Sequence, residues 1–153
     1  MSVFLSASVP KVGRGNFYES ADPFLIQVAI RELVTSIIRT NTLIWGGHPS
    51  ITPMIWAVCK DLGINYAERV YLYQSRLFED DFPEENMEFG NVTYVDRVDN
   101  DVEASLANLR LKMLTDHKID TGVFIGGMEG IFNEHALLQK HQPLANRIIL
   151  TSP

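Results

Sequence analysis

Cysteine, basic residues and long apolar runs are all scarce in this sequence. The single cysteine, Cys59, excludes an internal disulfide framework, and its place beside Val58 in an amphipathic stretch predicts a reduced core residue instead of a catalytic thiol. Lysine and arginine number 13 against 19 acidic residues, and the net charge of −6 argues against sequence-independent binding to nucleic-acid polymers. No apolar run approaches the roughly 20 residues that cross a bilayer, and the first residues lack a basic region followed by a long apolar stretch. We therefore expect a cytoplasmic protein that binds neither a membrane nor a nucleic-acid polymer.

The sequence is rich in strand-like and helix-like segments that alternate. Apolar runs typical of buried strands fall at residues 3–5, 42–45, 69–73, 92–95, 123–125 and 147–150. Helical spacing of apolar residues falls between them, at residues 24–39, 53–62, 101–115 and from 130 onward. Such alternation implies right-handed crossovers, so the predicted fold class is α/β, a Rossmann-like three-layer fold with a mainly parallel sheet.

The chain length fits one domain that covers residues 1–153. A helix normally follows the last strand of such a sheet, and none follows residues 147–150. There are three explanations: no helix packs on this strand, a second subunit packs on it, or the chain is truncated. The apolar helix at 24–39 is a candidate for a homodimer contact, although burial within one subunit explains it equally well.

Local signals mark several helix starts and loops. Asp22 is a predicted N-cap with Pro23 in the first turn, and Thr52 is a predicted N-cap with Pro53 at the first helical position. In the helix at 101–115, one side carries the apolar residues and is expected to face the core: Val102, Leu106, Leu109 and Met113. Residues 78–89 have no clear period and predict a loop that partly covers a site, and their acids, like those near residue 100, are expected to be solvated.

A glycine turn follows the apolar run Val123–Phe124–Ile125. Gly126 and Gly127 stop this strand, and a helix begins near Gly130. Backbone N–H groups in such a turn converge, unobstructed by Cβ atoms, on the positive end of the helix dipole. The turn predicts an anion-binding cradle, or else a tight connection that needs glycine only for its φ angles.

A second strand–glycine–helix junction occurs earlier in the chain. The strand-like run at 42–45 is stopped by Gly46, Gly47 and His48. Because parallel strands end at one edge of a sheet, and ligands of open α/β sheets bind there, we expect both turns to face one recess. His48 is expected either to reach a ligand or to cap the turn.

Polar residues after the first strand complete the candidate site. Ser6 and Ser8 are placed to donate to a phosphate or to bond to the local backbone. Arg14, in the polar segment that follows, offers a planar fork suited to phosphate, or is a solvated charge.

These motifs, in this order, resemble the SLOG superfamily. The resemblance rests on a first strand followed by Ser-Ala-Ser, on the run at 44–47 before a helix, and on the segment 124–130 with Glu134. This superfamily includes the Lonely Guy phosphoribohydrolases, the Smf/DprA proteins, and ligand-sensing domains of bacterial signalling and defence systems. The resemblance extends from Val3 to about Leu150.

In the Lonely Guy enzymes, a proline-Gly-Gly-x-Gly-Thr-x-x-Glu turn binds the phosphate of a nucleoside monophosphate, and its glutamate acts with an upstream arginine. The resemblance implies that Gly126, Gly127, Gly130 and Glu134 match this turn and that Arg110, sixteen positions before Gly126, matches the arginine.

Departures from that pattern shape the functional prediction. Ile125 replaces the proline, Ile131 replaces the threonine, and Met128–Glu129 is one residue longer than the usual gap. The pattern is therefore closer to the sensing branch, in which Met128 belongs to the binding turn and Glu129 or Glu134 accepts ribose hydroxyls. The first hypothesis is a sensor of a nucleotide-derived ligand that uses no cofactor or metal ion. The alternative is a nucleoside 5′-monophosphate phosphoribohydrolase in which Glu134 and Arg110 are catalytic.

Overall fold

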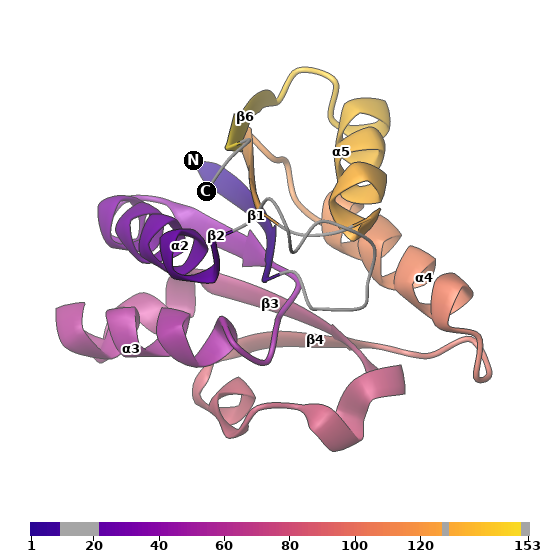
Figure 1. The fold of residues 1–153 in the computed structure, drawn as a ribbon, viewed down its shortest axis with the longest axis horizontal. Coiled ribbons are helices and arrows are strands. Elements are labelled where there is room, and N and C mark those ends of the chain that lie inside the picture. The colour runs from indigo at the N-terminus through magenta and orange to yellow at the C-terminus, as the bar shows by residue number, and fades with distance from the viewer. Residues whose placement is uncertain (10–21, 127–128, 151–153) are drawn as a thin grey trace.

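The computed structural model describes residues 1–9, 22–126 and 129–150 as a parallel sheet with helices on both faces (Figure 1). The six strands are ordered β4-β3-β2-β1-β5-β6 and every neighbouring pair is parallel. The elements, with η for a 3₁₀ helix, are β1 (Ser2–Ser8), α2 (Pro23–Ile37), β2 (Thr42–Trp45), α3 (Thr52–Leu62), η1 (Ile64–Arg69), β3 (Val70–Ser75), η2 (Arg76–Asp81), η3 (Glu84–Glu88), β4 (Asn91–Val95), α4 (Val102–Thr115), β5 (Thr121–Gly126), α5 (Glu129–His141) and β6 (Asn146–Leu150). The predicted three-layer Rossmann-like fold is confirmed.

The core lies on both sides of the central strands. Successive residues of β1 alternate between the two faces, so that Leu5 packs with the residues of α2 and α3 while Phe4 packs with those of α4 and α5. The rings of Phe4 and Phe124 meet edge to face with centroids 6.1 Å apart. Strands buried on both faces need apolar residues at every position, which explains the continuous runs in the sequence. Cys59 is fully buried in α3, where burial raises the pKa of its thiol to about 11, as expected of a core residue.

Helix α2 begins as its sequence predicts. The Asp22 carboxylate accepts hydrogen bonds from the N–H groups of Phe24 and Leu25, at 2.9 and 3.3 Å. The predicted N-cap of α3 is wrong, because Thr52 is the first helical residue and Ile51 occupies the cap position. The Thr52 hydroxyl accepts a hydrogen bond from the His48 N–H at 3.0 Å instead, and so closes the turn that follows β2.

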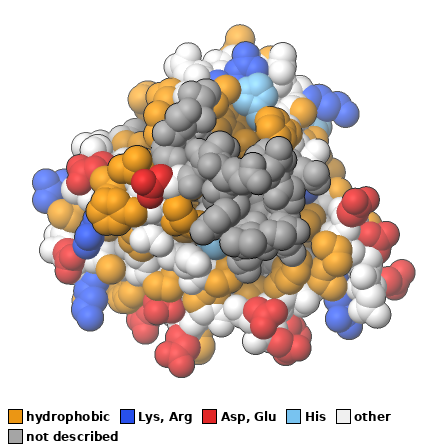
Figure 2. All heavy atoms as spheres, viewed as in Figure 1, with side chains coloured by type: hydrophobic (Ala, Val, Ile, Leu, Met, Phe, Trp, Pro, Cys, Tyr) orange, Lys and Arg blue, Asp and Glu red, His pale blue; other side chains and the backbone are white. Residues whose placement is uncertain are grey.

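The segment at 78–89 is not the predicted loop. It forms η2 and η3, and Phe89, which follows η3, packs edge to face on Trp56 of α3 with centroids 5.9 Å apart. Its acids Glu79, Asp80 and Asp81 are exposed as expected, and Figure 2 shows acidic side chains around the margins of the molecule in that view. Val102 is half exposed, against expectation, because it is the first residue of α4 and precedes the turns that pack on the sheet.

Strand β6 lies at one edge of the sheet and remains largely exposed. Ile148, Ile149 and Leu150 pair with β5 but keep 51%, 54% and 41% of their surface accessible. Within the part of the chain that the structure describes, no helix is long and apolar enough to cross a membrane.

Candidate functional site

A large hollow lies at the carboxyl edge of the sheet. Strands β2, β1 and β5 are neighbours and parallel, so they end at the same edge of the sheet, with Gly126 beside Ser8 and Trp45 beside Leu5. A cavity of about 1080 Å³ opens beside these ends and is walled by α4 and α5. The expectation that both glycine turns lie at one edge of the sheet is met.

The structure brings most of the candidate residues to this cavity. Those that line it are Ser6, Ser8, Gly46, Gly47, His48, Arg110, Gly130 and Glu134. Gly126 ends β5 directly beside Ser8. Arg14, Gly127, Met128 and the side chain of Glu129 lie outside the described residues. The segment at 78–89, which was expected to cover part of a site, contributes none of the described residues that line this cavity.

The turn after β2 is built around a glycine that cannot be replaced without strain. Gly47 has a φ of +78°, which favours glycine, and a Cβ added there would overlap the carboxamide of Gln74. The Nε2 of Gln74 donates a hydrogen bond to the Gly46 carbonyl at 2.9 Å. The His48 ring takes the predicted capping role, because its Nδ1 accepts the Ser50 N–H at 3.1 Å, and the residue also borders the cavity.

The last residue of β5 also has no room for a side chain. Gly126 has a φ of +58°, and an added Cβ would lie 2.6 Å from Ile26 Cδ1 and 3.1 Å from the Ser8 carbonyl oxygen. At the start of α5, a Cβ on Gly130 would lie 2.8 Å from Nη2 of Arg110. The absence of a side chain at Gly130 therefore makes room for the guanidinium against the first turn of the helix.

A partly buried hydrogen bond joins two of the candidate residues. Ser6 is only 2% exposed, and its hydroxyl donates to Oε2 of Glu134 at 2.7 Å. The hydroxyl thus donates to a distant side chain instead of its local backbone, and its contact with a phosphate stays a prediction. Burial raises the pKa of Glu134 above its ordinary value, while the Ser6 hydrogen bond and the Arg110 charge oppose that rise. Glu134 therefore holds its proton at a higher pH than a solvated carboxyl group.

Among the described residues that line the cavity, Arg110 is the one lysine or arginine. It takes part in no ion pair within 4 Å with the described side chains, which do not include that of Glu129, and its charge opposes the rise in the pKa of Glu134. Apolar side chains of α4 and α5, including Leu106, Met113 and Leu137, form the rest of the wall. The site thus joins backbone turns and a guanidinium, which suit an anion, to an apolar surface, which suits a flat ring.

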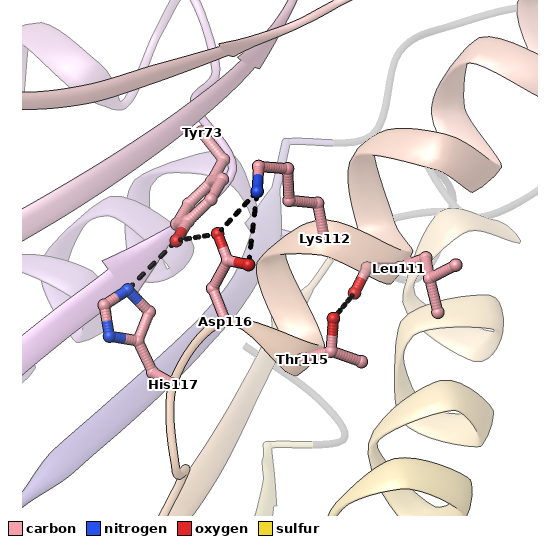
Figure 3. Close-up of polar contacts among 6 residues, drawn as sticks. All are labelled: Tyr73, Leu111, Lys112, Thr115, Asp116 and His117. Carbon is pink, nitrogen blue, oxygen red and sulfur yellow. Dashed lines mark hydrogen bonds and ion pairs between the residues drawn. The ribbon is translucent and has the colours of Figure 1, made fainter.

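A second polar cluster lies at the opposite, amino edge of the sheet (Figure 3). The Tyr73 hydroxyl donates to Asp116 Oδ2 and lies within 2.9 Å of both that oxygen and Nε2 of His117, while Lys112 pairs with Asp116 at 3.2 Å. Burial and the Asp116 carboxylate both raise the pKa of Tyr73. Tyr73, Asp116 and His117 border a smaller cavity of about 390 Å³.

Sequence reasoning missed this cluster and Gln74. Tyr73 and Asp116 are 43 positions apart, and Gln74 and Gly46 are 28 apart, so no local motif links either pair. The sequence shows Gln74 only as the polar residue that follows the apolar run at 69–73.

Comparison with known proteins gave one family. The family model described as the SLOG cluster3 family matches residues 16–153, which confirms the superfamily that the motifs predicted. No curated protein and no solved structure matched the chain.

Proposed function

Because this chain belongs to the SLOG cluster3 family, we propose that it binds a nucleotide or nucleotide-derived signalling molecule in the cavity at the carboxyl edge of the sheet. In this proposal it is a ligand sensor of a bacterial signalling or defence system. The observation that carries the proposal is the meeting, around one cavity, of the strained turn at Gly47, the helix start at Gly130 and Arg110, which forms no ion pair with the described side chains.

The phosphate end of the ligand is proposed to lie over the glycine turns. Backbone N–H groups at the start of a helix point toward an anion and add the positive end of the helix dipole. Arg110 lies against the first turn of α5, where Gly130 has no side chain to displace it. There the guanidinium neutralises the charge of the phosphate.

The nucleoside end is proposed to lie along α4 and α5. Leu106, Ile131 and Leu137 offer an apolar surface to a base, and Glu134 hydrogen-bonds to a ribose hydroxyl. With its raised pKa, Glu134 spends more of its time protonated, which spares a bound phosphate the repulsion of a second negative charge.

Thermal stabilisation by nucleotides tests the proposal. AMP, ADP and ADP-ribose are added to the wild-type protein, to Arg110→Ala and to Lys112→Ala, and the midpoint of unfolding is measured. A ligand that binds only the folded state raises the midpoint in proportion to the logarithm of its concentration over Kd. Arg110→Ala removes a charge-assisted contact of about 1.5–3 kcal/mol and is expected to weaken binding by roughly tenfold or more.

Lys112→Ala is the matched control, since Lys112 lies on the same helix two positions away and pairs with Asp116 at the other edge of the sheet. Its binding should equal that of the wild type. No stabilisation by any of these nucleotides, or equal stabilisation of Arg110→Ala, would refute the proposal.

One observation favours a second function, hydrolysis of an N-glycosidic bond. A carboxyl group with a raised pKa, in a cavity and near an arginine, is also what a general acid requires. In that reaction water adds to C1′ of the ribose, the bond to the base breaks, and the base leaves with a proton. Release of free base and ribose phosphate from AMP by the wild type, abolished in Glu134→Gln, would establish it.

A further inference from the structure

Gln74 lies behind the first glycine turn, on the side away from the cavity. It is 9% exposed within β3, and its Nε2 donates to the Gly46 carbonyl at 2.9 Å. Strand β3 pairs with one side of β2, whereas β1, which carries Ser6 and Ser8, pairs with the other side. The Gly46 carbonyl is therefore held toward β3.

The geometry of the peptide bond then fixes the direction of the next N–H group. In a planar trans peptide, the C=O of one residue and the N–H of the next point in opposite directions. Because Gln74 holds the Gly46 carbonyl toward β3, the Gly47 N–H points toward β1, on whose side Ser6 and Ser8 line the cavity.

Both residues that flank this peptide are glycines, so the peptide would otherwise rotate easily. Glycine lacks the Cβ that limits φ and ψ, and a Gly–Gly peptide has more orientations open to it than other peptides. Glycine at position 47 is also required for this contact, because the carboxamide of Gln74 occupies the space that a side chain at Gly47 would need.

We propose that Gln74 is a positioning residue that holds the Gly46–Gly47 peptide with its N–H presented to an anionic oxygen of the ligand. This inference rests on the proposed function, and it adds a residue that does not line the cavity. A donor that is already oriented before binding costs less conformational entropy when the ligand arrives.

Two substitutions separate this role from a merely structural one. Gln74→Met keeps a side chain of similar length without a donor, and Gln74→Glu replaces the donor by an acceptor that repels the Gly46 carbonyl. Affinities for AMP, ADP and ADP-ribose, and for adenosine as the phosphate-free probe, are measured by calorimetry. The ¹⁵N resonance of the Gly47 amide is recorded in each ligand-free protein.

The expected result is a selective loss. Affinity for the phosphate-bearing probes falls by about tenfold in Gln74→Met, as for loss of one hydrogen bond to a charged group, and by more in Gln74→Glu. Affinity for adenosine stays the same, and the Gly47 amide resonance moves in both variants. If Gln74→Met fails to fold, Gln74→Glu carries the test, with the unfolding midpoint as a check on both.

Several outcomes overturn the inference. Unchanged affinity for the phosphate-bearing probes, an equal loss for adenosine, or an unmoved Gly47 amide would each show that Gln74 does not act through this peptide. Failure of the wild type to bind any phosphate-bearing probe is a different result, because it removes the proposed function and the inference falls with it.

Discussion

The two edges of the sheet carry polar clusters of opposite character. At the amino edge, Tyr73, Asp116, His117 and Lys112 satisfy one another's hydrogen bonds and charges (Figure 3). At the carboxyl edge, the described ion pairs do not include Arg110, although it lies beside a large cavity. Side chains that satisfy one another's hydrogen bonds contribute to stability, whereas donors that no described side chain satisfies can bind a ligand.

This contrast gives opposite expectations for substitution at the two edges. Substitutions in the cluster at the amino edge should lower the free energy of unfolding and leave the affinity for nucleotides unchanged. Substitutions of the polar side chains at the carboxyl edge should lower that affinity and leave the free energy of unfolding equal or higher, because residues placed for function are often not those that stabilise the fold.

The largest effect is expected from the backbone of the carboxyl edge. Gly126→Ala brings a Cβ to 2.6 Å from Ile26 Cδ1 at a φ of +58°, and we expect a loss of about 2–4 kcal/mol in the free energy of unfolding. Urea denaturation measures it. Gly90→Ala is the matched control at the amino edge, since an added Cβ there meets nothing within 4 Å. Equal costs at both positions would contradict the picture of a tightly fitted carboxyl edge.

Tyr73→Phe should have the next largest effect. It removes the hydroxyl that donates to the Asp116 carboxylate at 2.9 Å, and the expected loss is about 1.5–3 kcal/mol, because a hydrogen bond to a charged acceptor is lost. The affinity for AMP, ADP and ADP-ribose should not change. A weaker affinity in this variant would show that the two edges are coupled, and the distinction between them would fail.

Glu134→Gln should produce a smaller change that depends on pH. Burial raises the pKa of Glu134 in the folded protein above the ordinary value of 4.5, so the folded state binds the proton more tightly than the unfolded state. The wild type therefore loses stability as pH rises from 4.5 to the folded pKa, and the variant does not. We expect Glu134→Gln to unfold at a higher temperature than the wild type at pH 7, with the gap closing as pH falls toward 4.5. If Glu134→Gln unfolds at a lower temperature than the wild type at pH 7, the predicted direction of the effect is wrong.

Lys112→Ala should have the smallest effect. Its ion pair with Asp116 is an exposed pair four residues apart on α4, with the two side chains 48% and 32% accessible. Such pairs contribute up to about 0.5 kcal/mol, and added salt should reduce the difference further. A loss above about 1 kcal/mol would mean that Lys112 is needed to hold Asp116 in place for Tyr73.

Sequence reasoning was most successful where the signal is local. The strand at 42–45 and the Asp22 cap of α2 were predicted as the structure has them. The Thr52 cap was wrong, because the turn at His48 makes its own hydrogen bonds and uses the Thr52 hydroxyl. The segment at 78–89 was misassigned, since 3₁₀ helices of a single turn or two have no amphipathic period to detect.

The sequence by itself determined the alternation of strands and helices, the burial of the central strands and the two glycine turns. These follow from apolar runs, helical spacing and the φ angles that only glycine adopts easily, all of which are properties of neighbouring residues. Only the tertiary structure decided which side chains meet at those turns. Ser6 bonds to Glu134 across 128 positions and Gln74 to Gly46 across 28, because strand order and register bring them together, and no local pattern encodes either.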